Sequence, residues 1–304
     1  MTEATPMSMI ETSGSDTNLK QPAPCRARVG LIDAHAHVFE RGLPLARQHR
    51  YAPDYDAPLD AYLGKLDSHG FSRGVLVQPS FLGTDSGYLL NALREAPARL
   101  RGIAVIEPDC RPEKLASMAR AGVRGVRLNL IGLPDLPLEE RLTRETLACL
   151  RQLGWHVEVH AEVSRLDHIV EPLLAEGLNV VVDHFGRPDH SLDLRGCRFR
   201  HLLQLAGTRR VWVKLSAAYR NWRNATGERH AHDAAQLLID AFTVERLLWG
   251  SDWPHTQYER SVNFSRTLES IRRLVPDEVK RHAILSDTPA RLYGFSDDAD
   301  TAAS

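Results

Sequence analysis

The sequence predicts an eight-stranded (β/α)8 barrel, and two regularities along the chain support that fold. Eight short runs rich in Val, Ile and Leu recur, as expected for parallel strands that are buried on both faces. Segments with apolar residues at helical spacing lie between them. Alternating strands and helices indicate βαβ units, and eight units indicate a closed barrel, although a doubly wound open sheet would give a similar pattern. The runs cover residues 29–38, 74–79, 101–107, 122–129, 155–160, 179–184, 211–216 and 246–252.

The length of the chain suits one barrel with short extensions. Of its 304 residues, we expect 29–295 to form the barrel domain. Residues 1–28 are rich in Ser, Thr and Pro and predict a disordered N-terminal extension, and 296–304 predict a short acidic tail. The expected helices are Leu59–His69, Glu113–Ala121, Glu140–Leu153, Arg165–Glu176 and His230–Ala241.

The composition excludes several classes of protein. The 38 basic and 39 acidic side chains give a net charge of -1, which argues against a nucleic-acid groove. The sequence contains no run of about 18 apolar residues, so it predicts no membrane span. It also lacks the apolar segment of a secretory signal near its N-terminus. The four cysteines are scattered, which suits a reducing cytoplasm. Glycine-rich nucleotide motifs are missing from the sequence. Whether the chain forms a homo-oligomer stays open.

Polar or ionisable residues finish most of the apolar runs. In a (β/α)8 barrel the carboxyl ends of the strands meet in one ring, and the active site is built there. Eight separate segments that each place polar groups at this end therefore predict an enzyme rather than a purely structural protein. The residues in question include His35, His37, Gln78, Ser80, Arg127, His160, His184 and Asp252.

The histidines and one aspartate form a candidate metal or catalytic set. His35 and His37 are two residues apart on a strand, so their side chains point to the same face. His160, His184 and Asp252 end three later runs and converge with them in a barrel. Imidazole nitrogens and a carboxylate suit one divalent ion, Zn²⁺ above all, with an open position for water. The same groups can also act without a metal.

Several motifs in one order resemble the amidohydrolase superfamily (amidohydrolase family 2). They are D33-A-H-A-H37, His160, D183-H-F-G-R-P188 and L248-W-G-S-D-W-P-H255, supported by R50-Y-A-P53. Within the superfamily the chain is similar to the branch that contains 2-pyrone-4,6-dicarboxylate lactonase. The resemblance runs from about residue 30 to 295 and implies a distorted TIM barrel. It also implies an active site at the C-terminal mouth and hydrolysis of a lactone.

The resemblance assigns roles to the histidines and the aspartate. Asp252 would be the general base that takes a proton from the attacking water. His35, His37 and His184 would hold a metal or polarise the lactone carbonyl directly. His160 stands where the metal-binding members have histidine and the lactonase has tyrosine, which favours a metal here. Superfamily members exist with and without a required metal, so both forms stay open.

The resemblance also implies an anionic substrate. Arg127, Arg187 and Arg220 match the carboxylate-binding positions of the lactonase, and guanidinium groups bind carboxylates through paired hydrogen bonds. The lactonase carries a second arginine six residues after the position that matches Arg127, and this chain has Leu133 there. The identity of the substrate ring and of its substituents therefore stays open. The further expected substrate contacts are Tyr51, Gln78, Ser80 and His160.

The sequence therefore predicts a hydrolase that opens a carboxylated lactone, such as 2-pyrone-4,6-dicarboxylate, with water activated by Asp252. A lactone isomerase and a metal-dependent decarboxylase of the same superfamily are the alternatives. A barrel that only binds its ligand is a third, and the intact set of His35, His37, His184 and Asp252 argues against it. Tyr219 and Trp222 flank Arg220 and either reshape the pocket or pack in the loop.

Overall fold

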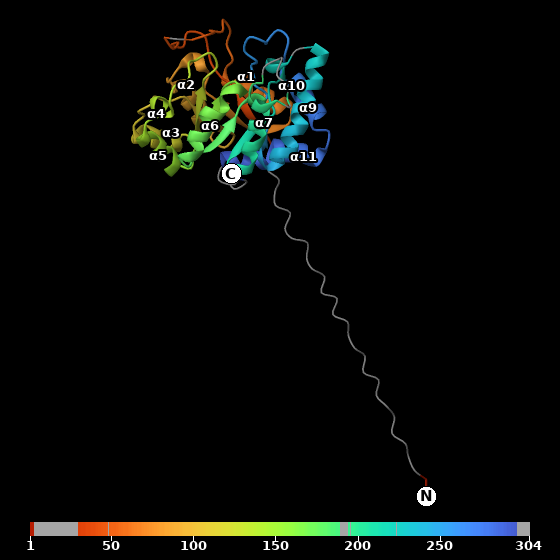
Figure 1. Ribbon diagram of the computed structural model, residues 1–304. Coiled ribbons are helices and arrows are strands. Elements are labelled where there is room, and N and C mark those ends of the chain that lie inside the picture. The colour runs from red at the N-terminus through yellow and green to blue at the C-terminus, as the bar shows by residue number, and fades with distance from the viewer. Residues whose placement is uncertain (3–29, 48, 189–193, 195, 223, 297–304) are drawn as a thin grey trace.

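The computed structural model describes residues 1–2, 30–47, 49–188, 194, 196–222 and 224–296. The expected N-terminal extension and acidic tail lie outside this part of the chain, apart from residues 1, 2 and 296. From residue 30 to residue 296, the described residues form one body in which helices surround a central sheet (Figure 1).

All eight expected strands are present, and they form one parallel sheet in sequence order from β1 to β8. The ring is closed between β1 and the segment after β8, where the His37 amide donates to the Trp253 carbonyl at 2.7 Å. The expected barrel is therefore confirmed, and the open sheet is excluded. The strands are β1 Leu31–Ala36, β2 Phe71–Val77, β3 Leu100–Ala104, β4 Val123–Asn129, β5 His156–His160, β6 Asn179–Val182, β7 Val211–Lys214 and β8 Leu247–Leu248.

Helices follow the strands and cover the outside of the barrel (Figure 1). They are α1 Leu59–Ser68, α2 Gly87–Glu95, α3 Pro112–Arg120, α4 Leu138–Arg141, α5 Arg144–Gln152, α6 Leu166–Ala175, α7 Cys197–Gln204, α8 Ala218–Asn221, α9 Asn224–Phe242, α10 Phe264–Leu274, α11 Glu278–His282 and α12 Thr288–Tyr293. Single turns are η1 Ser80–Leu82, η2 Val163–Arg165, η3 His184–Gly186, η4 Leu205–Thr208, η5 Val244–Arg246 and η6 Ala283–Asp287. No helix in the described ranges is long and apolar enough to cross a lipid bilayer.

The prediction of one continuous helix over Glu140–Leu153 is wrong. The chain forms α4 and α5 instead, because Leu142 has an extended backbone (φ -147°, ψ 122°). Thr143 then caps α5, and its side-chain oxygen accepts from the Thr146 amide at 3.3 Å. A threonine cap satisfies an amide that a new helix leaves without a partner, so a new helix begins here.

Two apolar layers hold the barrel. The larger lies between the strands and the surrounding helices, and the smaller fills the barrel interior with strand residues such as Ile32, Val75 and Leu248. Tyr293 of α12 and the following Phe295 join the interior cluster, and both are buried. With the interior filled, the polar strand ends are left to form the site.

Candidate active site

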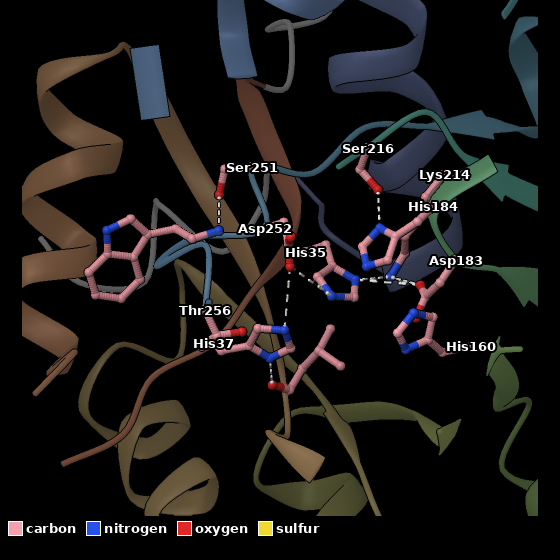
Figure 2. Close-up of polar contacts among 12 residues, drawn as sticks. His35, His37, His160, Asp183, His184, Lys214, Ser216, Ser251, Asp252 and Thr256 are labelled. Atoms are coloured by element: carbon pink, nitrogen blue, oxygen red, sulfur yellow. Dashed lines mark hydrogen bonds and ion pairs between the residues drawn. The ribbon is translucent and has the colours of Figure 1, made fainter. Parts of the chain in front are cut away.

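The polar residues at the strand ends surround one pocket of about 160 Å³. His35 does not line it but lies directly behind, fully buried, with its ring centroid 5.0 Å from that of His37 and 4.7 Å from that of His184. Figure 2 shows the histidines and Asp252 pointing toward one another. The expected site residues that line the pocket are His37, Tyr51, Ser80, Arg127, His160, His184, Arg187, Arg220 and Asp252.

Asp33 fixes the loop that carries Asp252 against the first strand. Its carboxylate accepts hydrogen bonds from the Ser251 hydroxyl at 2.6 Å, the Ser251 amide at 2.7 Å and the Tyr62 hydroxyl at 3.1 Å. The Asp252 amide donates to the His35 carbonyl at 2.8 Å. A β-carbon on Gly250 would lie 2.3 Å from that of His35, so only glycine permits this approach.

The two loops that hold His184 and Asp252 have unusual backbone angles. His184 (φ 52°), Arg187 (φ 49°), Asp252 (φ 59°) and His255 (φ 65°) all lie in the left-handed region, which disfavours residues other than glycine. Such conformations cost free energy and persist where the surrounding contacts impose them. Their clustering beside the pocket indicates that these loops are built to aim side chains.

Asp252 is a buried carboxylate held in its ionised form. Its Oδ2 accepts from the Tyr219 hydroxyl and from Arg220 Nε at 2.6 Å, while its Oδ1 lies 3.7 Å from His37 Nε2 and 4.0 Å from His35 Nε2. Burial by itself would raise the pKa of Asp252. The Arg220 guanidinium outweighs that effect and holds the pKa well below its usual range.

Burial favours the uncharged form of three histidines at the site, His35, His160 and His184. Burial, reinforced by the nearby Lys214 ammonium, lowers the pKa of His35 to about 4. Burial also holds the pKa values of His160 and His184 well below their usual range, and the Arg127 charge adds to this at His160. A neutral imidazole has one donor and one acceptor nitrogen, so each ring can donate one hydrogen bond.

The three expected arginines differ in how their charge is used. Arg127 donates to Asp183 Oδ2 through Nε at 3.0 Å and Nη2 at 2.9 Å, and Arg220 pairs with Asp252. Within the described ranges, Arg187 donates to the neutral Asn221 amide oxygen at 2.6 Å and makes no ion pair with a carboxylate. Among these residues its charge is therefore not balanced by a carboxylate.

Arg50 is a further pocket residue that the sequence analysis missed. It lines the pocket, and its Nη2 lies 3.5 Å from the Asn129 side-chain oxygen. Burial and the neighbouring Arg127 lower its pKa. Leu133, by contrast, is 44% exposed and does not line the pocket. Arg50 therefore supplies a positive group to the pocket, whereas Leu133 lies outside it. The position of Arg50 in the motif R50-Y-A-P53 was the signal that could have identified it.

Gln78 does not face the pocket. Its amide nitrogen donates to the carbonyls of Gly83 at 2.6 Å and Asp85 at 3.1 Å, and its oxygen accepts from the Val105 amide at 3.0 Å. The polar atoms of Gln78 therefore hold a loop together and do not point at the pocket, unlike the expected substrate contact. Trp222 packs against Phe185, with ring centroids 5.3 Å apart, and so belongs to the core.

Three of the five expected metal ligands lie close enough to share an ion. Ligand atoms of His35, His184 and Asp252 lie within 4.8 Å of one another, and these donor types suit Zn²⁺. The hydrogen bonding of His35 does not fit a bound ion, however. Lys214 Nζ lies 2.9 Å from His35 Nδ1, which places the proton of the neutral ring on Nε2, the nitrogen that faces Asp252.

A barrel with paired histidines at the end of the first strand, a histidine after the sixth and an ionised aspartate after the eighth is typical of a hydrolytic barrel enzyme. The amidohydrolase family matches residues 32–295, so the chain belongs to that family. The family expected from the sequence is confirmed.

Two similar proteins and one similar solved structure carry the names of lactone hydrolases. The chain is 32% identical over 275 residues to 4-sulfomuconolactone hydrolase of Rhizobium radiobacter, covering 87% of this chain and 90% of the relative. It is 31% identical over 277 residues to a 2-pyrone-4,6-dicarboxylate hydrolase of Comamonas testosteroni, with the same coverage. A solved Pseudomonas putida structure assigned to 2-pyrone-4,6-dicarboxylic acid hydrolase is 48% identical, with a TM-score of 0.83 and coverage of 89% and 99%.

Proposed function

We propose that the protein hydrolyses the ring ester of an anionic lactone, with 2-pyrone-4,6-dicarboxylate as the first candidate. The observation that carries this proposal is the ionised, buried Asp252 beside neutral histidines in an arginine-lined pocket. The names of the relatives support an anionic lactone. An Acinetobacter baumannii structure assigned to the same hydrolase, 36% identical with a TM-score of 0.84, was solved with citric acid bound, which is also a polycarboxylate.

Arg187 and Arg50 are the groups best placed to bind the substrate carboxylates. Both line the pocket, and neither pairs with a carboxylate of the described residues. Arg127 is 4% exposed and largely committed to Asp183, so we expect it to contribute less directly. Binding through two guanidinium groups would orient the ring before reaction and lower the entropic part of the barrier.

Asp252 then activates water. Its Oδ1 is the carboxylate oxygen without a strong donor, because Tyr219 and Arg220 occupy Oδ2. A water held at Oδ1 loses its proton to Asp252 as its oxygen attacks the lactone carbonyl carbon. The carbonyl oxygen becomes an oxyanion, which N–H groups of the surrounding histidines can stabilise.

Collapse of the tetrahedral intermediate breaks the bond to the ring oxygen. The proton held on Asp252 passes to that oxygen, so the aspartate is regenerated and the atoms of one water appear in the product. The new carboxylic acid ionises near neutral pH and releases one proton to the solvent. The ring-opened product is therefore favoured as the pH rises.

The first experiment follows the ultraviolet absorbance of 2-pyrone-4,6-dicarboxylate in the presence of the purified protein. We expect loss of the pyrone band, and we expect Asp252→Asn to lower the turnover by about 10²- to 10⁴-fold while citrate binding is retained. Unchanged turnover in Asp252→Asn would remove it as the base. If the folded protein leaves the pyrone band intact, muconolactone-type and sugar-acid lactones are tested next.

Titration at constant pH separates the competing reactions of the same superfamily. A hydrolase releases one proton per lactone opened, whereas an isomerase releases none and a decarboxylase yields carbon dioxide without a new carboxylate. One protein similar to this chain is an isomerase. It is the D-galactarolactone isomerase of Agrobacterium fabrum, with 25% identity over 278 residues. Base consumption that matches the loss of lactone would favour hydrolysis over both.

The remaining expectations stay predictions. We expect a cytoplasmic protein that acts on a small molecule without a nucleic-acid or membrane partner. Whether it forms a homo-oligomer is answered by sedimentation of the full chain.

A further inference from the structure

A buried ionic cluster lies beneath the pocket and takes no part in the mechanism above. Lys214 of β7, Glu158 of β5 and Asp183, which follows β6, are all fully buried. Lys214 Nζ lies 2.6 Å from Glu158 Oε2 and 3.3 Å from Asp183 Oδ1. The Lys214 amine therefore lies between two carboxylates, which are the close partners that a buried cation needs. In Figure 2, dashed lines join His35 to Lys214 and to Asp183.

The third contact of Lys214 fixes where the proton of His35 resides. An ammonium group only donates hydrogen bonds, and Lys214 Nζ lies 2.9 Å from His35 Nδ1. His35 Nδ1 must therefore accept, and the single proton of the neutral ring is on Nε2. Asp183 Oδ1, which could accept from a protonated Nδ1, lies farther away at 3.5 Å. His35 Nε2 is buried and has no hydrogen-bond partner among the described residues.

His160 has the same arrangement with a different cation. Arg127 Nη2 lies 3.2 Å from His160 Nδ1, and a guanidinium group also only donates. The buried Nε2 of His160 likewise lacks a partner in the described ranges. His37 is the opposite case, because its Nδ1 lies 2.7 Å from the Val77 carbonyl, which only accepts. That arrangement is typical of histidines that bind a metal through Nε2.

We propose that Lys214 is a positioning residue that holds His35 in the Nε2–H tautomer, so that His35 presents an N–H toward Asp252, behind the pocket, instead of binding a metal ion. Arg127 holds His160 in the same tautomer. The contribution of these protons to turnover rests on the proposed function. The tautomers themselves do not, because they follow from contacts within the protein.

The first test uses the wild-type protein without substrate. Histidine labelled with ¹⁵N in both ring nitrogens is incorporated, and long-range ¹H–¹⁵N spectra distinguish protonated from unprotonated nitrogens. Spectra of His35→Gln and His160→Gln assign the two rings. We expect Nε2–H in both at pH 7. Nδ1–H on His35 would overturn the proposal, whatever substrate the enzyme accepts.

The second test removes the donor. In Lys214→Met, Nδ1–H of His35 can donate to Asp183, which frees Nε2 for a metal. We expect Zn²⁺ affinity, measured by competition with a chromogenic chelator, to rise about 10-fold or more over wild type. If the lone Glu158 prevents folding, the pair Lys214→Met and Glu158→Gln is used. The exposed Lys280→Met is the matched control and should leave Zn²⁺ affinity unchanged.

Kinetics separate positioning from a merely structural role. Loss of one aligned N–H donor should lower kcat about 10²-fold, with a smaller change in KM. A Lys214→Met protein that folds but keeps the wild-type tautomer and Zn²⁺ affinity would refute the role of Lys214. A protein with the expected tautomers that opens no lactone would refute the proposed function alone.

Discussion

The pairing of Arg220 with Asp252 should set the lower pH limit of activity. Arg220 Nε lies 2.6 Å from Asp252 Oδ2, and Asp252 is 1% exposed, so this cation is the main influence that offsets the cost of burying the carboxylate. An opposite charge at such a distance lowers a carboxyl pKa by about 1–3 units. This corresponds to about 1.4–4 kcal/mol in favour of the ionised form.

The substitution Arg220→Met removes that influence while keeping much of the side-chain volume. The pKa of Asp252 then rises, because burial acts on it with less opposition. Activity requires the carboxylate form, so the acid limb of the kcat/KM profile, which reports the free enzyme, should move to higher pH. Activity at pH 5 is lost before activity at pH 8.

The assay is the lactone-opening rate between pH 4 and 9, with Arg260→Met as the matched control because Arg260 is exposed. Substrate concentration is varied at each pH, since loss of a pocket arginine should also raise KM. Circular dichroism confirms that the variant is folded. An acid limb that stays where it is in wild type would show that Arg220 does not govern the ionisation of Asp252.

Three further predictions concern the metal, the substrate and the fold. Dialysis against a strong chelator should leave turnover unchanged. Turnover that is lost on dialysis and restored by Zn²⁺ alone would show that His35 does not carry its proton on Nε2. Arg187→Met should raise KM for a dicarboxylate lactone by about 10- to 100-fold, since a hydrogen bond to a charged group contributes about 1.5–3 kcal/mol. Asp33→Ala should lower the free energy of unfolding in urea by about 3 kcal/mol or more, because it leaves the buried donors of Ser251 and Tyr62 without their acceptor. Asp240 is exposed, so Asp240→Ala is the control and should change this free energy little.

The fold could be predicted from the sequence because its signals are local. Each strand is buried on both faces by its own helix and by the barrel interior, so each appears as a short apolar run such as 179–182. The polar residue that ends a run is equally local, and nine of the expected site residues line the pocket. The break between α4 and α5 was missed because Thr143 acts as a cap only when Leu142 is extended, which the helical spacing of the region does not reveal.

The partners of the site residues could not be predicted in the same way. Glu158 and Lys214 each stand within an apolar strand, which indicates a buried charge in need of a partner, but the sequence does not say which one. Gln78 ends its strand as a substrate contact would, and only the loop after β2 shows that its amide is already satisfied.

By itself, the sequence determined the barrel, the family and the residues gathered at its mouth, because a repeated burial pattern and the order of short motifs are properties of neighbouring residues. The tertiary structure decided what each group can do. Closing the ring places Lys214 against His35, 179 positions away in the chain, and Arg220 against Asp252. The proton position on an imidazole and the charge of a carboxylate depend on such neighbours and on exclusion of water, and both are fixed only when the barrel closes.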